Sequence, residues 1–157
     1  MIQIIDIGGN YGSLQNAFRR LDCPVVITPT PDLSKPMIVP GVGHAAAAMR
    51  RMPDIRKATG PVLGICLGYH LMCRHTEEGP IDCLGIFPSM VGKLPVTQFG
   101  WKQTAWGWMY FCHGYGTWAF AEIKGNFMGV QFHPEKSGKN GLAFLDRWLQ
   151  GRVSEAA

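Results

Sequence analysis

The sequence predicts an α/β fold built on a mainly parallel, helix-covered sheet, and three observations lead to this class. Short β-branched runs alternate with helix-prone segments in the first half of the chain, a pattern typical of parallel sheets. The 20 glycines and 11 prolines follow no period, which favours tight turns and excludes collagen-like or repeat architectures. A length of 157 residues fits one domain spanning residues 1–157.

The first half of the chain supplies most of the alternating elements. Isoleucines dominate Met1–Ile7, which predicts a buried strand that ends at a Gly-Gly turn. From Ser13 the apolar residues follow helical spacing, and Val25–Thr28 and Met37–Val39 then resemble short strands. The alanine-rich segment His44–Met52 predicts the next helix.

The second half begins in the same way and then changes. Pro61–Ile65 predicts a strand that leads into a helix through Tyr69–Met72. Beyond Glu78 short strands with glycine turns are expected, and a last helix is expected near Gly141–Leu149. The expected strands are Leu84–Leu94, Trp106–Cys112, Gly116–Glu122 and Phe127–Phe132.

Charge and cysteine content limit the possible partners and compartments. The net charge of +4 comes from scattered basic pairs without a long basic run, so nucleic acid is not expected as the main partner. The Trp-rich segment Gln103–Ala121 is interrupted by glycines, so no membrane span is expected. Five cysteines and a start that lacks a signal-peptide pattern favour a reducing, cytoplasmic location.

The first candidate reactive group is Cys66. It lies in Gly64-Ile-Cys66-Leu-Gly68, between a predicted strand and a predicted helix, where a nucleophile elbow requires glycines on both sides of a strained turn. A helix N-terminus would also stabilise a thiolate. The pattern alone leaves open that Cys66 is a buried structural cysteine.

The second candidate group is the pair His133 and Glu135, which follows another predicted strand. In an extended segment these two residues face the same way, so a histidine base and a carboxylate that orients it are possible. A solvated turn remains the alternative. Residues 40–43, Pro-Gly-Val-Gly, also follow a predicted strand, and N–H groups of this flexible turn together with that of Leu67 would suit an oxyanion.

Metal and cofactor sites are not expected. Cys66, His70, Cys73 and His75 have no common zinc-site spacing and no second paired motif. The tryptophans are expected to serve packing and interfaces and not a ligand cage.

Several blocks in order resemble the class I glutamine amidotransferases, and within them the glutaminase subunits of imidazole glycerol phosphate synthase. The resemblance covers Ile4 to about Leu149 and implies a flavodoxin-like parallel or mixed sheet with helices on both faces. The matching blocks are Pro40–Gly43 with His44, Met49–Arg51, Gly64–Gly68, Phe99–Trp101, Tyr110–His113 and Gln131–Ser137.

This resemblance implies the activity and its residues. Cys66, His133 and Glu135 would form a triad that hydrolyses L-glutamine through a γ-glutamyl thioester, with Val42 and Leu67 at the oxyanion hole. Ammonia would pass to a (β/α)8-barrel cyclase subunit in a heterodimer of histidine biosynthesis. Substrate-binding positions would be Gly43, His70, Glu78 and Tyr115, and partner-interface positions would be Trp101, Lys102 and Lys136.

The chain also departs from the family pattern. The family usually has Gln at the position of His70, Ser or Thr at Gly114, and Asn at Lys102. The chain is also expected to lack segments before Leu94 and between Tyr115 and Lys124. These departures favour two alternatives: a catalytically weakened subunit that docks on a barrel synthase, or ammonia supply for a surface-sugar or modified-nucleotide synthase.

Overall fold

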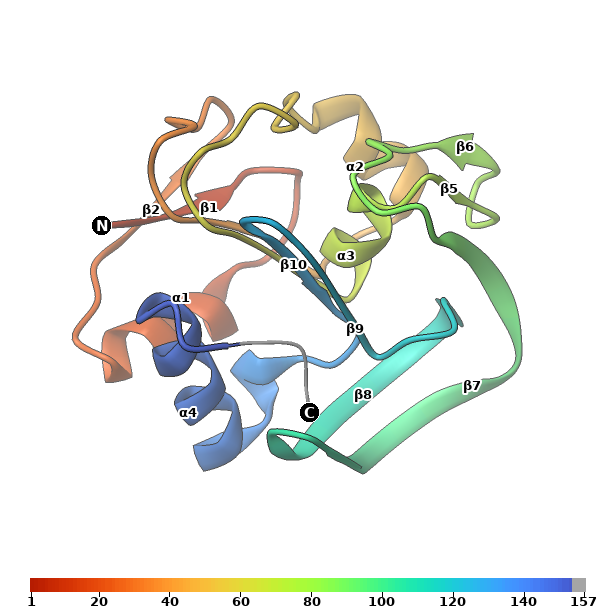
Figure 1. Cartoon of the computed structure of the whole chain (residues 1–157). Helices are drawn as coiled ribbons and strands as arrows, with labels where there is room; N and C mark the ends of the chain where they lie inside the picture. The colour runs from red at the N-terminus through yellow and green to blue at the C-terminus, as the bar shows by residue number, and fades with distance from the viewer. Residues whose placement is uncertain (154–157) are drawn as a thin grey trace.

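A computed structural model describes residues 1–153, so the last four residues of the predicted 1–157 domain lie outside the described residues. The centre of the chain is a six-stranded sheet in the order β2-β1-β3-β4-β10-β9 (Figure 1). All neighbours pair in parallel except β9, which runs antiparallel to β10. Its strands are β1 (Ile2–Ile5), β2 (Val25–Thr28), β3 (Met37–Val39), β4 (Val62–Ile65), β9 (Ala121–Lys124) and β10 (Phe127–Val130).

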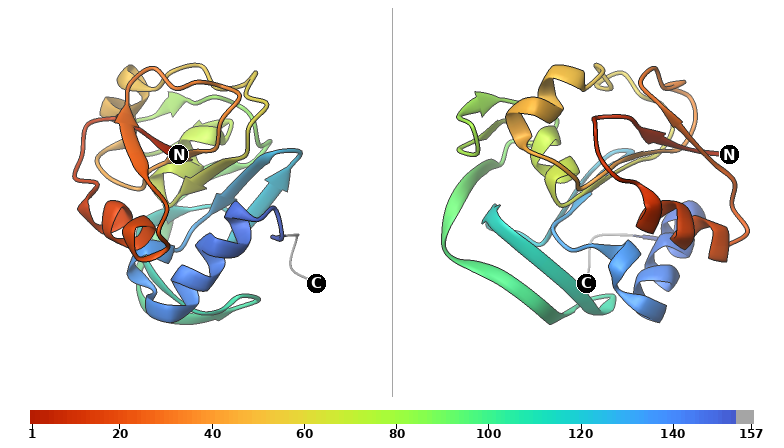
Figure 2. Two further views of the ribbon diagram at one scale, coloured as in Figure 1. Left: turned by 90° about the vertical axis from the view of Figure 1, so that its left-hand side faces the viewer. Right: turned by 180° about the vertical axis from the view of Figure 1, so that it is seen from behind.

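Helices cover both faces of this sheet, as the sequence predicts (Figure 2). The cause is the alternation of side chains along buried strands: Ile4 packs with the helices α1 and α4, and its neighbour Ile5 packs with α2 and α3. The helices are α1 (Gly12–Arg20), α2 (Ala45–Arg51), α3 (Leu67–Met72) and α4 (Gly138–Leu149). No helix within residues 1–153 is long and apolar enough to cross a membrane.

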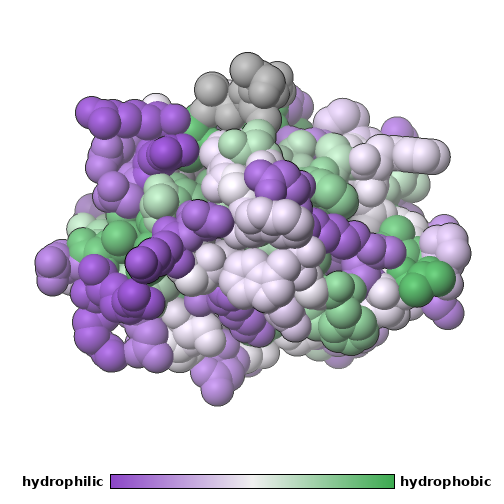
Figure 3. Space-filling view, turned by 90° about the horizontal axis from the view of Figure 1, so that it is seen from below, coloured by the Kyte–Doolittle hydropathy of each residue, from purple (hydrophilic) through white to green (hydrophobic). Residues whose placement is uncertain are grey.

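A second, four-stranded sheet in the order β6-β5-β7-β8 lies beside the first (Figure 1). Its main feature is a long antiparallel hairpin of β7 (Met90–Thr104) and β8 (Gly107–Gly116). The short strands β5 (His75–Thr76) and β6 (Ile81–Asp82) complete it. Seen from below, pale and apolar groups interrupt the hydrophilic surface (Figure 3).

Two predicted strands in this region are wrong. Most of Leu84–Leu94 precedes β7, which begins only at Met90. Gly116–Glu122 is not one strand, because Gly116 ends β8 and β9 begins at Ala121. The intervening turn is held by Thr117, whose hydroxyl donates to the carbonyl of Ala119 and accepts from its N–H. Local side-chain hydrogen bonds of this kind compete with a strand ladder.

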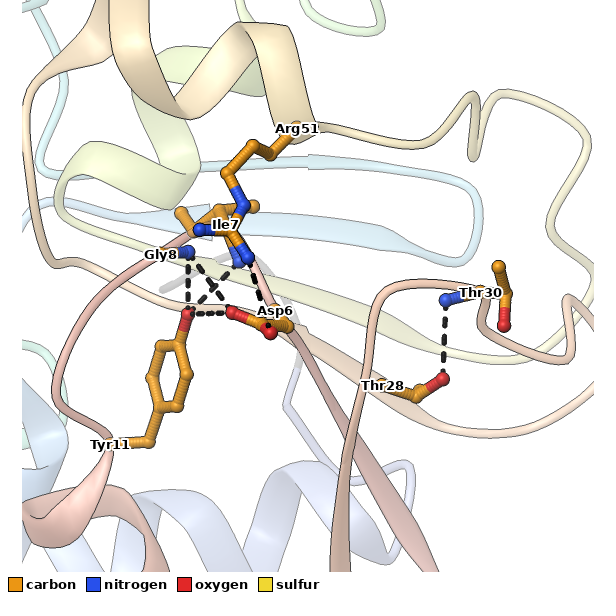
Figure 4. Close-up of polar contacts among 7 residues, drawn as sticks. All are labelled: Asp6, Ile7, Gly8, Tyr11, Thr28, Thr30 and Arg51. Carbon is orange, nitrogen blue, oxygen red and sulfur yellow. Dashed lines mark hydrogen bonds and ion pairs between the residues drawn. The ribbon is translucent and has the colours of Figure 1, made fainter.

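The loop after β1 is fixed by a polar cluster (Figure 4). The Tyr11 hydroxyl donates to Oδ1 of Asp6 over 2.9 Å and accepts from the N–H groups of Ile7 and Gly8. Arg51, at the end of α2, pairs with the same carboxylate over 3.4 Å. The cluster ties β1 to α2, the helix that follows the Pro-Gly-Val-Gly turn.

Candidate active site

Cys66 lies at a strained turn between β4 and α3. Its φ of +48° falls in the left-handed region that non-glycine residues rarely adopt. A Cβ at Gly68 would lie 1.9 Å from the carbonyl oxygen of Val39, and a Cβ at Gly64 would lie 2.6 Å from Sδ of Met72. Both glycines are therefore required by close backbone packing around the cysteine.

The carboxyl ends of neighbouring strands bring the histidine to this turn. In the parallel β4–β10 pair, Ile65 is opposite Val130, and the Cys66 N–H donates to the Val130 carbonyl over 2.8 Å. His133 comes three residues after Val130 in the sequence. A Cβ at Gly41 would lie 3.0 Å from Cβ of Cys66 and 3.1 Å from Cε1 of His133, so all three residues are adjacent.

His133 and Glu135 form a buried pair. Nδ1 of His133 and Oε1 of Glu135 are 2.7 Å apart, and the two side chains are only 6% and 5% exposed. The expectation of an extended segment here is wrong, because residues Pro134–Lys136 form a 3-10 helix. Ser137 closes this turn, with its hydroxyl donating to the His133 carbonyl over 2.6 Å.

The charge state of His133 follows from these contacts. Burial disfavours the imidazolium, but hydrogen bonds to Cys66 and Glu135 favour it and together raise the pKa of His133. A protonated His133 beside the Cys66 sulfur is suited to hold a proton and to return it there.

A cleft of about 290 Å³ opens at Cys66 and His133. It collects most of the site residues predicted from the sequence, drawn from five separate segments. The predicted residues that line it are Gly43, Cys66, Leu67, His70, Glu78, Tyr115, His133 and Lys136. Gly114, which departs from the family pattern, also lies in its wall.

The remaining predicted residues lie outside that cleft. Val42 and Glu135 line an adjoining pocket of about 270 Å³, which shares Gly41 and Lys136 with the cleft. Trp101 lies on the hairpin, half exposed, with its ring 5.9 Å from that of Tyr110. Its neighbour Lys102 points the other way, with Nζ 5.5 Å from the ring centroid of Phe111.

Two buried polar residues of the site were not predicted from the sequence. Gln131 bonds both His70 and Cys66, and His113 lines the cleft. Burial and the neighbouring His70 lower the pKa of His113 to about 4, so it is neutral at pH 7. Gln131 stands two residues before His133 in the sequence, and this period-two spacing was a usable signal.

Comparison with known proteins decides the family. The family model for class I glutamine amidotransferases matches residues 3–115, which is more than half of the chain. The chain belongs to the class I glutamine amidotransferases. The match contains the Cys66 turn and ends at Tyr115, in the wall of the cleft.

Curated relatives extend the likeness of this amidotransferase over nearly its whole length. It is 35% identical to the imidazole glycerol phosphate synthase subunit HisH of Idiomarina loihiensis, with 90% of this chain and 92% of the relative covered. It is 34% identical to HisH 2 of Legionella pneumophila, with 95% and 97% covered. The first alignment spans 181 positions, more than the 157 residues of the chain, so the relative has segments that this amidotransferase lacks.

Solved structures show the same fold at low identity. A glutamine amidotransferase crystal structure gives a TM-score of 0.67 at 15% identity, covering 96% of this chain and 98% of the other. A glutamine amidotransferase from Thermotoga maritima gives 0.55 at 16% identity, covering 98% and 85%. The fold class predicted from the sequence is thereby confirmed.

Proposed function

We propose that this chain is the glutaminase subunit of an imidazole glycerol phosphate synthase in histidine biosynthesis. It would hydrolyse L-glutamine to glutamate and ammonia. The observation that carries the proposal is the adjacency of Cys66 and His133 at one cleft, with Glu135 2.7 Å behind the histidine. Identity of 34–35% to HisH subunits over nearly the whole chain supports the pathway.

The reaction proceeds in two halves. Cys66 Sγ attacks the side-chain amide carbon of glutamine, while the thiol proton resides on His133 and Glu135 fixes the imidazole. N–H groups of Leu67 and Val42 bind the oxyanion. Collapse breaks the C–N bond, His133 protonates the departing ammonia, and a γ-glutamyl thioester remains. A water that loses its proton to His133 then hydrolyses the thioester to glutamate and the free thiol.

The ammonia acceptor belongs to a partner subunit. We propose a heterodimer in the cytoplasm with a (β/α)8-barrel cyclase, which would contact Trp101, Lys102 and Lys136. Trp101 is half exposed on the hairpin, and Lys136 lines the rim of the cleft. Val42, beside Gly41, would complete the oxyanion hole only after the barrel has docked, because ammonia released without an acceptor is lost to solvent.

The direct test is glutamate release from glutamine by the purified chain mixed with a candidate barrel subunit and that subunit's nucleotide ligand. We expect release in the complex, and loss of at least about 1,000-fold in Cys66→Ala because the covalent path is removed. Cys23→Ala is the matched control, since Cys23 is a free cysteine by the pocket between α1 and β2. Unchanged release by Cys66→Ala contradicts the proposal.

One observation favours a second candidate, a weakened docking subunit. His70 stands where the family usually has a substrate-holding Gln, and its Nε2 is already bonded to Gln131 over 2.8 Å. In that case the complex forms, yet no glutamate is released by wild type. His70→Gln would then restore release, whereas the glutaminase proposal expects wild type to be active.

A further inference from the structure

A polar chain separate from the His133–Glu135 pair ends on the Cys66 sulfur. Nε2 of Gln131 donates to Sγ of Cys66 over 3.5 Å, and Oε1 of the same amide lies 2.8 Å from Nε2 of His70. The Gln131 and His70 residues are 1% and 3% exposed. Gln131 directly follows β10 and His70 lies in α3, so these two hydrogen bonds connect β10 and α3 to the Cys66 sulfur.

The direction of each hydrogen bond follows from what the atoms can donate. The NH₂ group of Gln131, which can only donate, faces the Cys66 sulfur, and its carbonyl oxygen, which can only accept, faces His70. That oxygen requires a donor, which is the Nε2–H of His70. Burial lowers the pKa of His70 to about 4, against a smaller opposing effect of the Gln131 bond. His70 is therefore a neutral, single-tautomer donor at pH 7.

We propose that His70 is a positioning residue for Cys66, acting through Gln131 to hold an N–H donor on the sulfur and favour the thiolate. A hydrogen bond to the charged form of a group stabilises that form. Without His70, the Gln131 amide can rotate and present its oxygen to the sulfur, which repels a thiolate. The inference deepens the proposed function and rests on Cys66 as its nucleophile.

Other titratable groups also influence Cys66, so variants must be compared with one another. His133 bonds the thiol directly, and its pKa is raised. The remaining titratable groups that line the cleft are Glu78, Cys112, His113, Tyr115 and Lys136. These groups are present in every variant, but replacing His70 also changes the surroundings of His113, whose pKa His70 lowers. Gln131→Met keeps His70, so its profile reports the loss of the N–H donor on the sulfur more directly.

The test is the pH dependence of Cys66 alkylation by iodoacetamide in the full chain, followed by peptide mapping. Gln131→Met removes the donor at similar volume, and we expect the midpoint to rise by about one pH unit, the effect of losing one hydrogen bond to a charged group. His70→Leu should raise it by about half a unit. His70→Gln should restore the wild-type midpoint, because its Nε2 reaches the place of the imidazole Nε2.

His75→Leu is the control, since His75 bonds Asp82 on β6. Profiles of Gln131→Met and His70→Leu that coincide with wild type, in proteins with intact circular dichroism, overturn the proposal. Where a variant does not fold, the test is made on wild type by following the NMR resonances of the Gln131 side-chain amide over a pH titration. These resonances should shift when Cys66 ionises, and resonances that do not shift overturn the proposal. Alkylation uses no glutamine, so failure of glutaminase activity with these shifts intact counts only against the proposed function.

Discussion

The central sheet and the β7–β8 hairpin differ in how tightly their chains are held. Strands β1, β3, β4 and β10 are buried along their whole length. At the turn after β4 the backbone approaches so closely that Gly64 and Gly68 leave no space for a methyl group. On the hairpin, β7 has one buried residue, Val91, and its other residues are half-buried or exposed. A Cβ at Gly100 would meet nothing within 4 Å.

The packed sheet holds the reacting groups, whereas the hairpin forms an exposed surface. Cys66 and His133, which must align within tenths of an ångström, follow strands of the packed sheet. The hairpin instead carries large exposed side chains, Phe99, Trp101 and Trp108. The shortening expected before Leu94 and between Tyr115 and Lys124 would fall on the start of the hairpin and on its connection to β9, the edge strand of the central sheet. Loss of chain there would leave β4 and β10, the strands that lead to Cys66 and His133, unchanged.

The largest expected effect comes from adding one methyl group to each region. Gly68→Ala should destabilise the fold by at least about 3 kcal/mol, because the methyl group overlaps the Val39 carbonyl at 1.9 Å. Gly92→Ala on β7 should change stability by less than about 0.5 kcal/mol, since its nearest neighbour, Glu77 Oε2, is 3.7 Å away. Urea unfolding measures both. Equal losses would contradict the difference in packing.

The next effect is the loss of folding stability in acid, which depends on the buried histidines. The pKa of His70 is about 4 in the fold, below its ordinary 6.5, because burial disfavours the charged ring. Its unfolded form binds the proton first, so stability is complete above pH 6.5 and falls as pH drops toward 4, by about 3 kcal/mol in all.

His70→Gln tests this loss of stability in acid, measured by urea unfolding at pH 4 and 7. The variant should lose much less stability between these values than wild type does. A residual loss is expected from His113 on the hairpin, whose pKa is also lowered to about 4. An unchanged loss in His70→Gln would place the acid sensitivity elsewhere.

The smallest expected effect on folding lies on the hairpin surface. Trp101→Ala should alter stability by less than about 1 kcal/mol, because the side chain is half exposed on the hairpin, beside Tyr110. The affinity of the Trp101→Ala variant for the barrel subunit should fall about 10- to 100-fold, because exposed aromatic side chains often supply much of the binding energy at an interface. Titration calorimetry measures the affinity, with the fully exposed Trp118 replaced as the control. Equal affinities for both variants would remove Trp101 from the interface.

The same two regions explain what the sequence predicted. Runs of β-branched residues with glycines beside them allowed β1, β3 and β4 to be predicted from the sequence, together with the turn at Cys66. On the hairpin side, strand limits depend on pairing between distant residues and on the Thr117 turn, so Gly116–Glu122 was assigned wrongly. The bond between His70 and Gln131 joins residues 61 positions apart, and only the fold brings them together.

The most direct test of the account is to stop the reaction of the wild-type complex with glutamine by rapid acid quench and to map its peptides by mass spectrometry. The account predicts a γ-glutamyl group on the peptide that contains Cys66, and none on the peptides that contain Cys23 or Cys112. Steady glutamate release with Cys66 unmodified, and still present in Cys66→Ala, would contradict it.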